Sequence, residues 1–400
     1  MSEAWLSIIG LTEDGLAGLN DASLLALNTA DIVFGGPRHL ALVNVSVGSS
    51  GRGRAWSIPF DVTPVLALRG QRVVVLASGN PFWFGVGGSL AAHLSVTEWQ
   101  VFSAPSTFSL AAARLGWRLE DTACFGLHAS AFASTRSALH RDQRLICLMR
   151  DGAAVGEFAR WLSVQGFGAS NLWVLEALGG PHERLRKTTV AQFSFLDVRA
   201  PVAVALQVAS ASGANVLPRS AGLPDIRFAS DGQITKSPIR ALTLAALAPS
   251  PGLHLWDIGA GSGSVSVEWC LAGGHATAIE QYPHRAVNIR SNADSFGLIK
   301  SLRIVEGLAP QALEGLTPPD AIFVGGGFNA ELFRVLKNFA PPTCRLVVNA
   351  VTLETEAVLA CLHAEHGGEL LRIELAHAAP LGRMRGWVSA RPVVQWSVAL

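Results

Sequence analysis

Charged side chains are scarce in this sequence, and long apolar runs are absent. Asp, Glu, Lys and Arg make up 15% of the 400 residues and the formal net charge is +1, so no basic block of the kind that binds nucleic acid is present. The longest apolar stretches, such as residues 73–77 and 201–206, fall far short of the roughly 20 residues that cross a bilayer. We therefore expect neither a nucleic-acid partner nor a membrane span.

Cysteine and lysine are also rare. The five cysteines are odd in number and include no Cys-x-x-Cys pair, which argues against a disulfide framework and against a zinc site. No basic region followed by a long apolar core opens the sequence, so we expect no signal peptide and a cytoplasmic location. Nearly all positive charge is Arg, which suits carboxylate ligands, although a biased genome composition would have the same effect. Lysine occurs only at Lys187, Lys236, Lys300 and Lys337.

What the sequence does contain is a regular alternation of strands and helices. Apolar residues make up 50% of it, and the length exceeds that of one ordinary domain, so we expect two or more cores. Short β-branched runs alternate with helical stretches up to residue 208, which predicts an α/β fold. The clearest strands are 7–9, 31–34, 72–76, 145–148 and 201–206, and the clearest helices are 23–30, 108–115 and 156–164.

A domain boundary is predicted in the middle of the chain. Residues 209–230 contain few core formers and several glycines and prolines, which indicates a linker. Beyond it, Ser237 followed by Pro238 predicts a helix over 238–247, with Ser237 as its N-cap and proline at its first position. We therefore divide the chain into a first domain of residues 1–208, a linker of 209–230 and a second α/β domain of 231–400.

A glycine-rich turn in the second domain predicts a nucleotide site. The motif DIGAGSG at 257–263 lies between a predicted strand, 253–258, and a predicted helix, 264–271. Such a turn lets a ligand approach the backbone at a helix amino terminus. Glu280 lies 21 residues after Gly259, at the end of the next strand, where it can accept hydrogen bonds from ribose hydroxyls. The alternative is a turn that only packs closely.

The spacing of this motif distinguishes two ligand classes. A dinucleotide fingerprint would place its third glycine at 264, but that position is Ser and the third glycine is Gly263. With Asp257 before it, the motif resembles that of class I S-adenosylmethionine-dependent methyltransferases. Further strands at 302–305, 320–324 and 344–348 and a closing antiparallel hairpin of 369–376 with 387–395 fit the Rossmann-like sheet that this resemblance implies. Three glycines at 325–327 follow the fourth strand.

A second motif lies in the first domain. The sequence SGNPFWFGVG at 78–87 follows a buried strand and resembles the Ser-Gly-Asp-Pro signature of the tetrapyrrole methylases, with Asn80 in place of the usual Asp. Loops 10–19 and 104–109 stand at matching places in that family, whose fold has two lobes. Residues 176–183 resemble the branch that acts at carbon 5 of a precorrin ring.

Two loops of the first domain depart from the methylase pattern. The first loop carries Thr12, Glu13 and Asp14 where the family has Gly-Pro-Gly, and His128 lacks the Gly-Arg that often follows it. These departures put an acid–base or anion-binding role for the first loop in doubt. For His128 they favour a place in the core or in a loop.

Taken together, the two halves resemble the fused methylases of the cobalamin pathway. Residues 231–236 and 349–354 are similar to the partner that methylates carbon 15 and removes a carboxyl group. The resemblance implies methylation of precorrin-6B at carbons 5 and 15, decarboxylation of its carbon-12 acetate, and precorrin-8X as product. It also implies a precorrin substrate, two S-adenosylmethionine sites, no metal, and a homo-oligomer, such as a tetramer formed through the carboxy-terminal domain.

The resemblance also assigns site residues, though no catalytic acid or base. Arg383 and Arg385, near the predicted sheet edge, are candidates for the carboxylates of the substrate, with ordinary solvated arginines as the alternative. The donor contacts are Asn80, Ser106 and Thr107 in the first domain and Thr235, Gly259, Ala260, Gly261, Ser262, Gly263, Glu280 and Ala309 in the second.

Two other functions stay open at this point. A nicotinamide oxidoreductase would also use a glycine-rich strand–helix turn, although the position of Gly263 disfavours it. A non-catalytic or half-active scaffold of the corrin pathway would explain Asn80 and the altered loops of the first domain.

Overall fold

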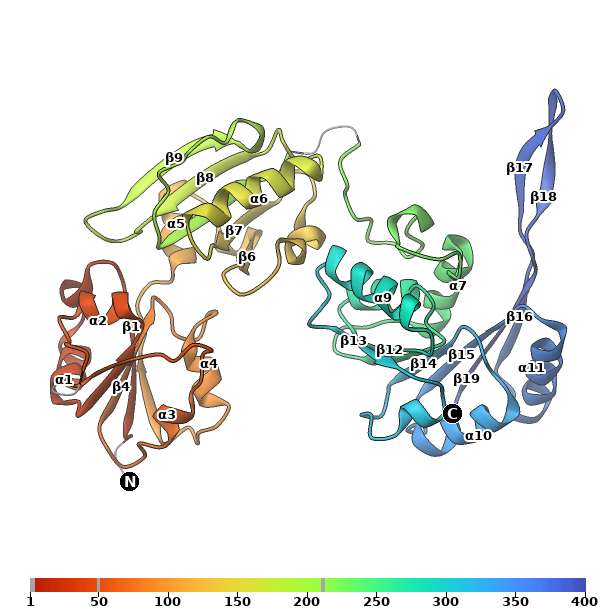
Figure 1. The fold of residues 1–400 in the computed structure, drawn as a ribbon, viewed down its shortest axis with the longest axis horizontal. Helices are drawn as coiled ribbons and strands as arrows, with labels where there is room; N and C mark the ends of the chain where they lie inside the picture. The colour runs from red at the N-terminus through yellow and green to blue at the C-terminus, as the bar shows by residue number, and fades with distance from the viewer. Residues whose placement is uncertain (1–3, 49–50, 210–212) are drawn as a thin grey trace. The chain divides into compact units, whose positions relative to one another are not determined.

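The structure is a computed structural model that describes residues 4–48, 51–209 and 213–400 (Figure 1). Residues 210–212 of the predicted linker and residues 1–3 at the amino terminus lie outside the described residues. The chain divides into two compact units, residues 1–132 with 138–216 and residues 133–137 with 217–400. No helix in the described part is long and apolar enough to span a membrane.

The first unit begins with a parallel sheet in the order β3-β2-β4-β1-β5. Alternate side chains of β1 face opposite ways: Ile9 packs with α1 and α2, and Ile8 packs with α3 and α4. Helices therefore cover both faces. The bounds are β1 Leu6–Leu11, β2 Ile32–Gly35, β3 Gly53–Ala55, β4 Val73–Ser78, β5 Trp99–Phe102, α1 Asp21–Thr29, α2 Pro37–Leu42, α3 Thr63–Leu66 and α4 Val86–Ala91.

A second sheet of the same unit has the order β6-β7-β10-β8-β9 and is antiparallel except for the pair β6 and β7. Phe108 of α5 packs on one face of it and Phe158 of α6 on the other. The bounds are β6 Thr122–Gly126, β7 Arg144–Leu148, β8 Asn171–Glu176, β9 Arg184–Thr189, β10 Val202–Gln207, α5 Thr107–Leu115 and α6 Gly152–Val164.

The second unit contains a seven-stranded sheet in the order β13-β12-β11-β14-β15-β19-β16. The strand order reverses between β11 and β14, the place where open α/β sheets bind ligands. Helices α7, α8 and α9 pack on one face, and α10 and α11 on the other. The strands are β11 His254–Ile258, β12 His275–Glu280, β13 Leu302–Glu306, β14 Ala321–Val324, β15 Arg345–Ala350, β16 Glu369–Ile373 and β19 Val393–Ala399, and the helices are α7 Ser237–Leu247, α8 Ser264–Leu271, α9 Pro283–Ser295, α10 Ala330–Phe339 and α11 Leu353–His366.

The predicted α/β class is confirmed, but helices start up to four residues earlier than predicted, as α6 and α7 show. Helix α6 begins at Gly152 rather than 156, because the Asp151 side chain caps it by accepting from Ala154 N at 2.8 Å. Helix α7 ends at Leu247 as predicted but begins at Ser237, one residue early, so its N-cap is Lys236 and not Ser237. The Ser237 hydroxyl instead donates to Gly222 O at 2.8 Å, which ties α7 to the preceding segment.

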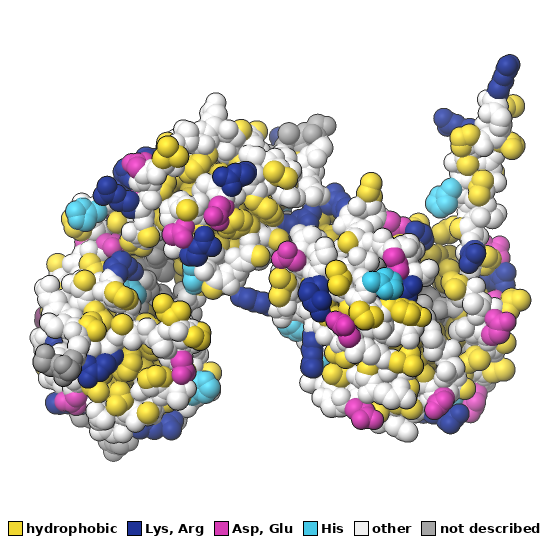
Figure 2. All heavy atoms as spheres, viewed as in Figure 1, with side chains coloured by type: hydrophobic (Ala, Val, Ile, Leu, Met, Phe, Trp, Pro, Cys, Tyr) yellow, Lys and Arg dark blue, Asp and Glu magenta, His cyan; other side chains and the backbone are white. Residues whose placement is uncertain are grey.

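The predicted closing hairpin is only partly correct. β16 and β19 are antiparallel neighbours, but residues between them form a separate two-stranded ribbon, β17 (Ala376–Leu381) with β18 (Met384–Ser389). Pro392 lacks an N–H and stands where the predicted second strand breaks into β18 and β19. The ribbon projects from the sheet, with basic side chains at its tip and hydrophobic ones along it (Figures 1 and 2).

Part of the predicted linker packs on the second unit. Leu223 and Phe228 belong to the core cluster formed with α7 and α8, with 1% and 7% of their surfaces exposed. The sequence gives little sign of this because these two apolar residues stand among glycines, prolines and serines.

Candidate functional site

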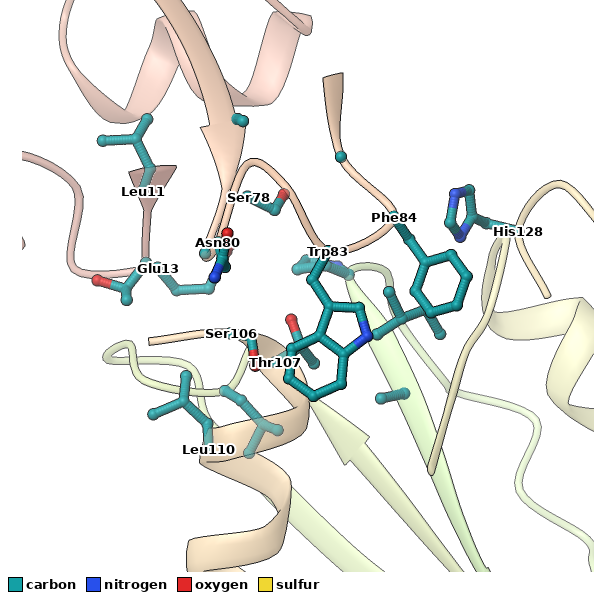
Figure 3. Close-up of a pocket in the computed structure, with 18 of the residues that line it drawn as sticks. Leu11, Glu13, Ser78, Asn80, Trp83, Phe84, Ser106, Thr107, Leu110 and His128 are labelled. Atoms are coloured by element: carbon teal, nitrogen blue, oxygen red, sulfur yellow. The ribbon is translucent and has the colours of Figure 1, made fainter. Parts of the chain in front are cut away.

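A cavity of about 490 Å³ lies in the first unit, lined by residues from both of its sheets (Figure 3). β1 and β4 are parallel neighbours, with Leu11 opposite Ser78, so the loops that follow them leave the same edge. The first of these loops brings Glu13 to the cavity, and the second brings Asn80 and Trp83.

Glycine allows these loops to approach each other. A Cβ atom at Gly10 would overlap the carbonyl oxygen of Gly79, and a Cβ at Gly79 would lie 2.8 Å from Pro105 O. Gly79 also has a φ of +54°, a conformation that costs other residues free energy. The strand-end motif recognised in the sequence is thus the point where three chain segments meet.

The three donor residues predicted in the first domain all line this cavity. Asn80 Oδ1 accepts from Phe82 N at 2.9 Å, so this side chain stabilises its own turn. An Asp carboxylate could accept the same bond, and the replacement keeps the local geometry. The Ser106 hydroxyl caps α5 by accepting from Ser109 N at 3.0 Å, and Thr107 is the first residue of that helix.

Two aromatic residues of the same loop were not predicted as site residues. Trp83 and Phe84 line the cavity, and both rings contact Phe108, with centroids 4.8 and 5.8 Å apart. They are 37% and 52% exposed, which is unusual for large aromatic rings. A sequence signal exists, because three consecutive aromatic residues, 82–84, stand inside a turn that is otherwise rich in small and polar residues.

A polar cluster closes one side of the cavity. Arg38 pairs with Glu13 and donates to Ser78 Oγ at 2.9 Å. The Nε2 atom of His39 lies 2.9 Å from the same hydroxyl. Burial and, second, the charge of Arg38 lower the pKa of His39 to about 4, so its imidazole is neutral near pH 7.

We expect the free energy of unfolding of the first unit to fall as the pH is lowered from about 6.5 to about 4. Over this range His39 takes up a proton in the unfolded chain but not in the folded one, which costs about 3 kcal/mol of stability in all. Urea unfolding at several pH values measures it. The His39→Gln variant should lose this part of the pH dependence, and an unchanged slope in that variant would contradict the assignment.

A second cavity, of about 460 Å³, lies in the second unit at the reversal of strand order between β11 and β14. Its floor is apolar and includes Ile258 and Ile279, the residues near the ends of two neighbouring strands. Of the donor residues predicted in this domain, those that line the cavity are Thr235, Gly259, Ala260, Gly261, Glu280 and Ala309. Ser262 and Gly263 do not line it.

All three glycines of the turn adopt left-handed backbone conformations, with φ of +68° at Gly259, +59° at Gly261 and +71° at Gly263. A Cβ at Gly263 would lie 2.8 Å from a methyl group of Ile289, so this glycine lets α9 pack closely. A Cβ at Gly261 would lie 2.8 Å from Gln233 O. The turn therefore needs glycine for two reasons: its backbone is left-handed, and neighbouring groups leave no room for a Cβ atom.

Two acidic residues hold the turn in place. The Glu280 carboxylate is 3% exposed and accepts from Gly261 N at 2.8 Å and from Tyr282 N at 3.0 Å. Asp257 accepts from Ser266 N and Oγ and so joins β11 to α8. Burial raises the pKa of Asp257 to about 6, whereas its bonds from Ser266 act in the opposite direction. Glu280 lines the cavity, whereas Asp257 does not and has a structural role.

Residues 222–236, which we call the strap, form one wall of this cavity through Gln233, Ile234, Thr235 and Lys236. Arg240 is fully buried and donates to the carbonyls of Leu223 and Thr235 in the strap. Its Nε also donates to Glu268 Oε1 at 2.6 Å, and Glu268 accepts from the backbone of Gly222 and Leu223. A buried ion pair thus fixes the wall of the cavity.

Arg383 and Arg385 are not where the sequence placed them. Both lie on the exposed ribbon β17–β18 and not at the edge of the main sheet, and neither lines the second cavity. The sequence pattern could not separate the ribbon from the sheet. Among the residues that the structure describes, no three His, Cys, Asp or Glu side chains are grouped as a bound metal ion would require.

Comparison with known proteins matches both halves. Residues 6–194 match the family model of tetrapyrrole (corrin/porphyrin) methylases, and residues 226–400 match that of the precorrin methyltransferase domain. A precorrin-6Y C(5,15)-methyltransferase (decarboxylating) of Sinorhizobium sp. is 46% identical over 402 residues, covering 98% of this chain and 96% of that protein. The protein of the same name from Mycobacterium tuberculosis (strain CDC 1551 / Oshkosh) is 38% identical, with 98% of each chain covered.

The chain belongs to the precorrin-6Y C5,15-methyltransferase (decarboxylating) family. Methyltransferases of this family use S-adenosylmethionine. The crystal structure of the C-terminal domain of a precorrin-6Y C5,15-methyltransferase from Rhodobacter capsulatus is 57% identical, covers 45% of this chain and 98% of that one, and gives a TM-score of 0.45. The resemblance inferred from the motifs is confirmed, and a nicotinamide oxidoreductase is set aside.

Proposed function

We propose that this chain methylates precorrin-6B at carbons 5 and 15 and removes the carboxyl group of its carbon-12 acetate, giving precorrin-8X in cobalamin biosynthesis. The observation that carries the proposal is the 46% identity over almost the whole length of a relative with that name. Two separate cavities, each at the carboxyl ends of parallel strands and beside a glycine turn, support it.

The two reactions are divided between the two halves of the chain. The first domain, residues 1–208, methylates carbon 5, and the second, residues 231–400, methylates carbon 15 and decarboxylates. The two family models, which match residues 6–194 and 226–400, support this division. The packing of Leu223 on the second unit argues for placing the linker before residue 217.

Each half holds its own methyl donor, S-adenosylmethionine, which supplies an electrophilic methyl group when bound. The second cavity fits such a group, since Gly259 and Gly261 line it with backbone alone, and Glu280 can accept hydrogen bonds from ribose hydroxyls. In the first cavity, the backbone around Asn80, Ser106 and Thr107 forms the wall, with Trp83 beside it.

The work of the protein is positioning rather than acid–base chemistry. Methyl transfer is an in-line displacement, so the donor and the accepting carbon have to be held in near-attack geometry with water excluded. The loops at Gly79 and Gly261 pack closely against neighbouring backbone, which suits this role. For the decarboxylation, the conjugated macrocycle of the substrate can act as the electron sink that a cofactor would otherwise supply.

The protein acts as a homo-oligomer, such as a tetramer, formed through the second domain. The ribbon β17–β18 supports this proposal, because it carries large hydrophobic side chains that nothing covers in the described residues of one chain. Their exposed fractions are 69% for Leu381, 77% for Met384, 78% for Trp387 and 59% for Val388.

Isothermal titration calorimetry tests for the donor sites without the tetrapyrrole substrate. We expect two molecules of S-adenosylhomocysteine to bind per chain, because each half contains a donor cavity. Mass analysis of the product formed from precorrin-6B should show two added methyl groups and the loss of one carbon dioxide. One methyl group would identify a half-active fusion, and none would identify the scaffold that Asn80 suggested. One binding site would contradict the two-donor proposal.

A further inference from the structure

A cavity of about 580 Å³ in the first unit continues from the donor cavity, with which it shares Glu13, Arg38, Ala200 and Pro201. Its other charged or titratable lining residues are Glu176, His182, Glu183, Arg184 and Arg199. None of these five was predicted as a site residue from the sequence, although Glu176, His182 and Glu183 fall in the stretch that resembles the carbon-5 branch.

Every carboxylate of this cavity is already neutralised by an arginine. Glu13 pairs with Arg38. Glu183 accepts from Arg114 Nη2 at 2.9 Å and from Gly179 N at 2.8 Å. Glu176 accepts two hydrogen bonds from Arg184, at 2.7 and 2.8 Å, and one from Arg186 at 3.0 Å. No lining carboxylate therefore remains unpaired to repel an anion.

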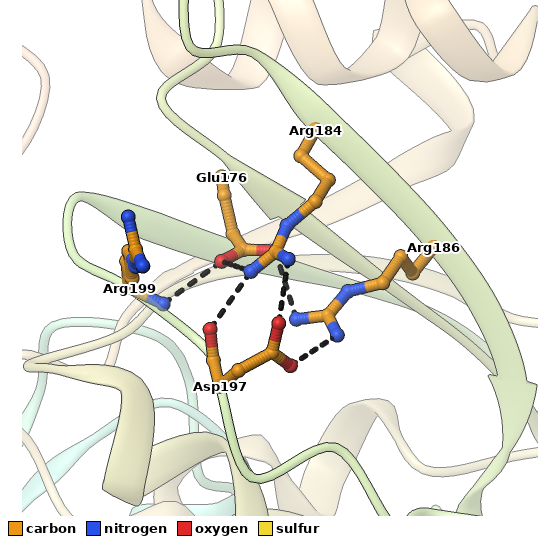
Figure 4. A network of polar contacts seen from close by, with 5 residues as sticks. All are labelled: Glu176, Arg184, Arg186, Asp197 and Arg199. Atoms are coloured by element: carbon orange, nitrogen blue, oxygen red, sulfur yellow. Dashed lines mark hydrogen bonds and ion pairs between the residues drawn. The ribbon is translucent and has the colours of Figure 1, made fainter.

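Arg199 and His182 are different from the other charged or titratable groups of the cavity. Over residues 4–48, 51–209 and 213–400, neither the Arg199 guanidinium nor the His182 ring makes a hydrogen bond or an ion pair. Figure 4 shows the Arg199 side chain turned away from the carboxylates, while its backbone N donates to Glu176 at 2.8 Å. The cavity thus presents one uncompensated positive charge and a ring N–H.

Hydrogen bonds and ion pairs hold the chain on either side of Arg199. Asp197 accepts from Arg184 and Arg186, each at 2.6 Å, and these bonds lower the pKa of Asp197 to about 2. Glu176 is 3% exposed: burial alone would raise its pKa, but the bonds from Arg184, the Arg199 backbone and Arg186 hold the pKa below its usual value. The network keeps residues 197–199 against β8 and so fixes where Arg199 projects.

We propose that Arg199, with His182, binds a carboxylate side arm of the substrate and so orients the macrocycle for methylation in the adjoining cavity. The ligand group that fits this site is a planar carboxylate, because an unpaired guanidinium can bind it with two parallel hydrogen bonds. This inference rests on the proposed function only in the identity of the substrate. The networks at Glu176 and Asp197 position Arg199.

The test is a steady-state comparison of carbon-5 methylation in the wild type, Arg199→Gln, Arg199→Lys and His182→Ala. We expect Arg199→Gln to raise the KM for the tetrapyrrole about tenfold, since a charge-assisted contact is lost. The value of kcat and the KM for the donor should change little. Arg199→Lys should recover part of the loss. An unchanged tetrapyrrole KM in Arg199→Gln would overturn the proposal.

Two controls separate this proposal from the function itself. Arg141→Gln removes an exposed arginine of the same unit that lines none of the described cavities, and it should leave the KM unchanged. Binding is measured independently by tryptophan fluorescence with a porphyrin that carries a carboxylate on every side chain. Arg199→Gln should weaken this binding and leave that of a neutral amide porphyrin as it is. If the wild type binds the carboxylate porphyrin more tightly than Arg199→Gln does but methylates no precorrin, the proposed function fails while the carboxylate site stands. Equal binding of this porphyrin by the wild type and Arg199→Gln refutes the site.

Discussion

Gly261→Val will strongly reduce methylation at carbon 15 while methylation at carbon 5 continues. Gly261 has a φ of +59°, a region that β-branched residues avoid, and its Cβ would lie 2.8 Å from Gln233 O. The side chain would therefore push the strap out of the wall of the donor cavity. We expect the carbon-15 rate to fall roughly a hundredfold or more, equivalent to about 2.7 kcal/mol of barrier. NMR of product made with a labelled methyl donor separates the two positions.

Gly252→Val is the matched control for backbone strain. Gly252 also has a positive φ, +83°, in the same unit, but nothing lies within 4 Å of the Cβ it would gain. It should keep both methylations. Normal carbon-15 methylation by Gly261→Val would show that this turn is not the donor site. Loss of both methyl groups in a folded Gly261→Val protein would instead indicate an obligatory order that begins in the second domain.

The glycine turn shows what a sequence can and cannot predict here. The spacing of Gly259, Gly261 and Gly263 between a strand and a helix predicts the cavity, because the motif is local. The sequence suggested that a side chain at Gly261 would enter the space of the ligand. In the structure it meets Gln233 first, and that contact depends on how a segment almost thirty residues upstream folds back over the turn.

The arginines illustrate the same limit. Arg383 and Arg385 stand between glycines near the end of the chain, and the pattern alone could not place them on a projecting ribbon. Arg199 has no motif around it. What distinguishes it is that Arg184 and Arg186 are paired with Glu176 and Asp197 and it is not, which is a property of the fold.

The strongest effect on stability is expected from Arg240→Met. Arg240 is fully buried and joins Glu268 to two carbonyls of the strap, so its removal leaves a buried carboxylate without its partner. Breaking a buried pair in this way costs about 3–5 kcal/mol. The cost should fall on the second unit alone, because every partner of Arg240 belongs to it. Urea unfolding of the full chain measures the loss of stability, and hydrogen exchange of the two units shows which of them is destabilised.

Two further variants show whether the loss of stability in Arg240→Met comes from burial of the ion pair or from the loss of a charge alone. Arg290 pairs with Glu306 at 3.4 Å on the surface of the same unit, so Arg290→Met should cost less than about 1 kcal/mol. Adding Glu268→Leu to Arg240→Met removes the unpaired buried charge and should restore part of the stability. Arg240→Met should also weaken donor binding, because the strap loses the bond from Arg240 to Thr235. The double variant lacks the same bond, so it should not restore donor binding. Equal costs for Arg240→Met and Arg290→Met would mean that the buried pair does not hold the strap.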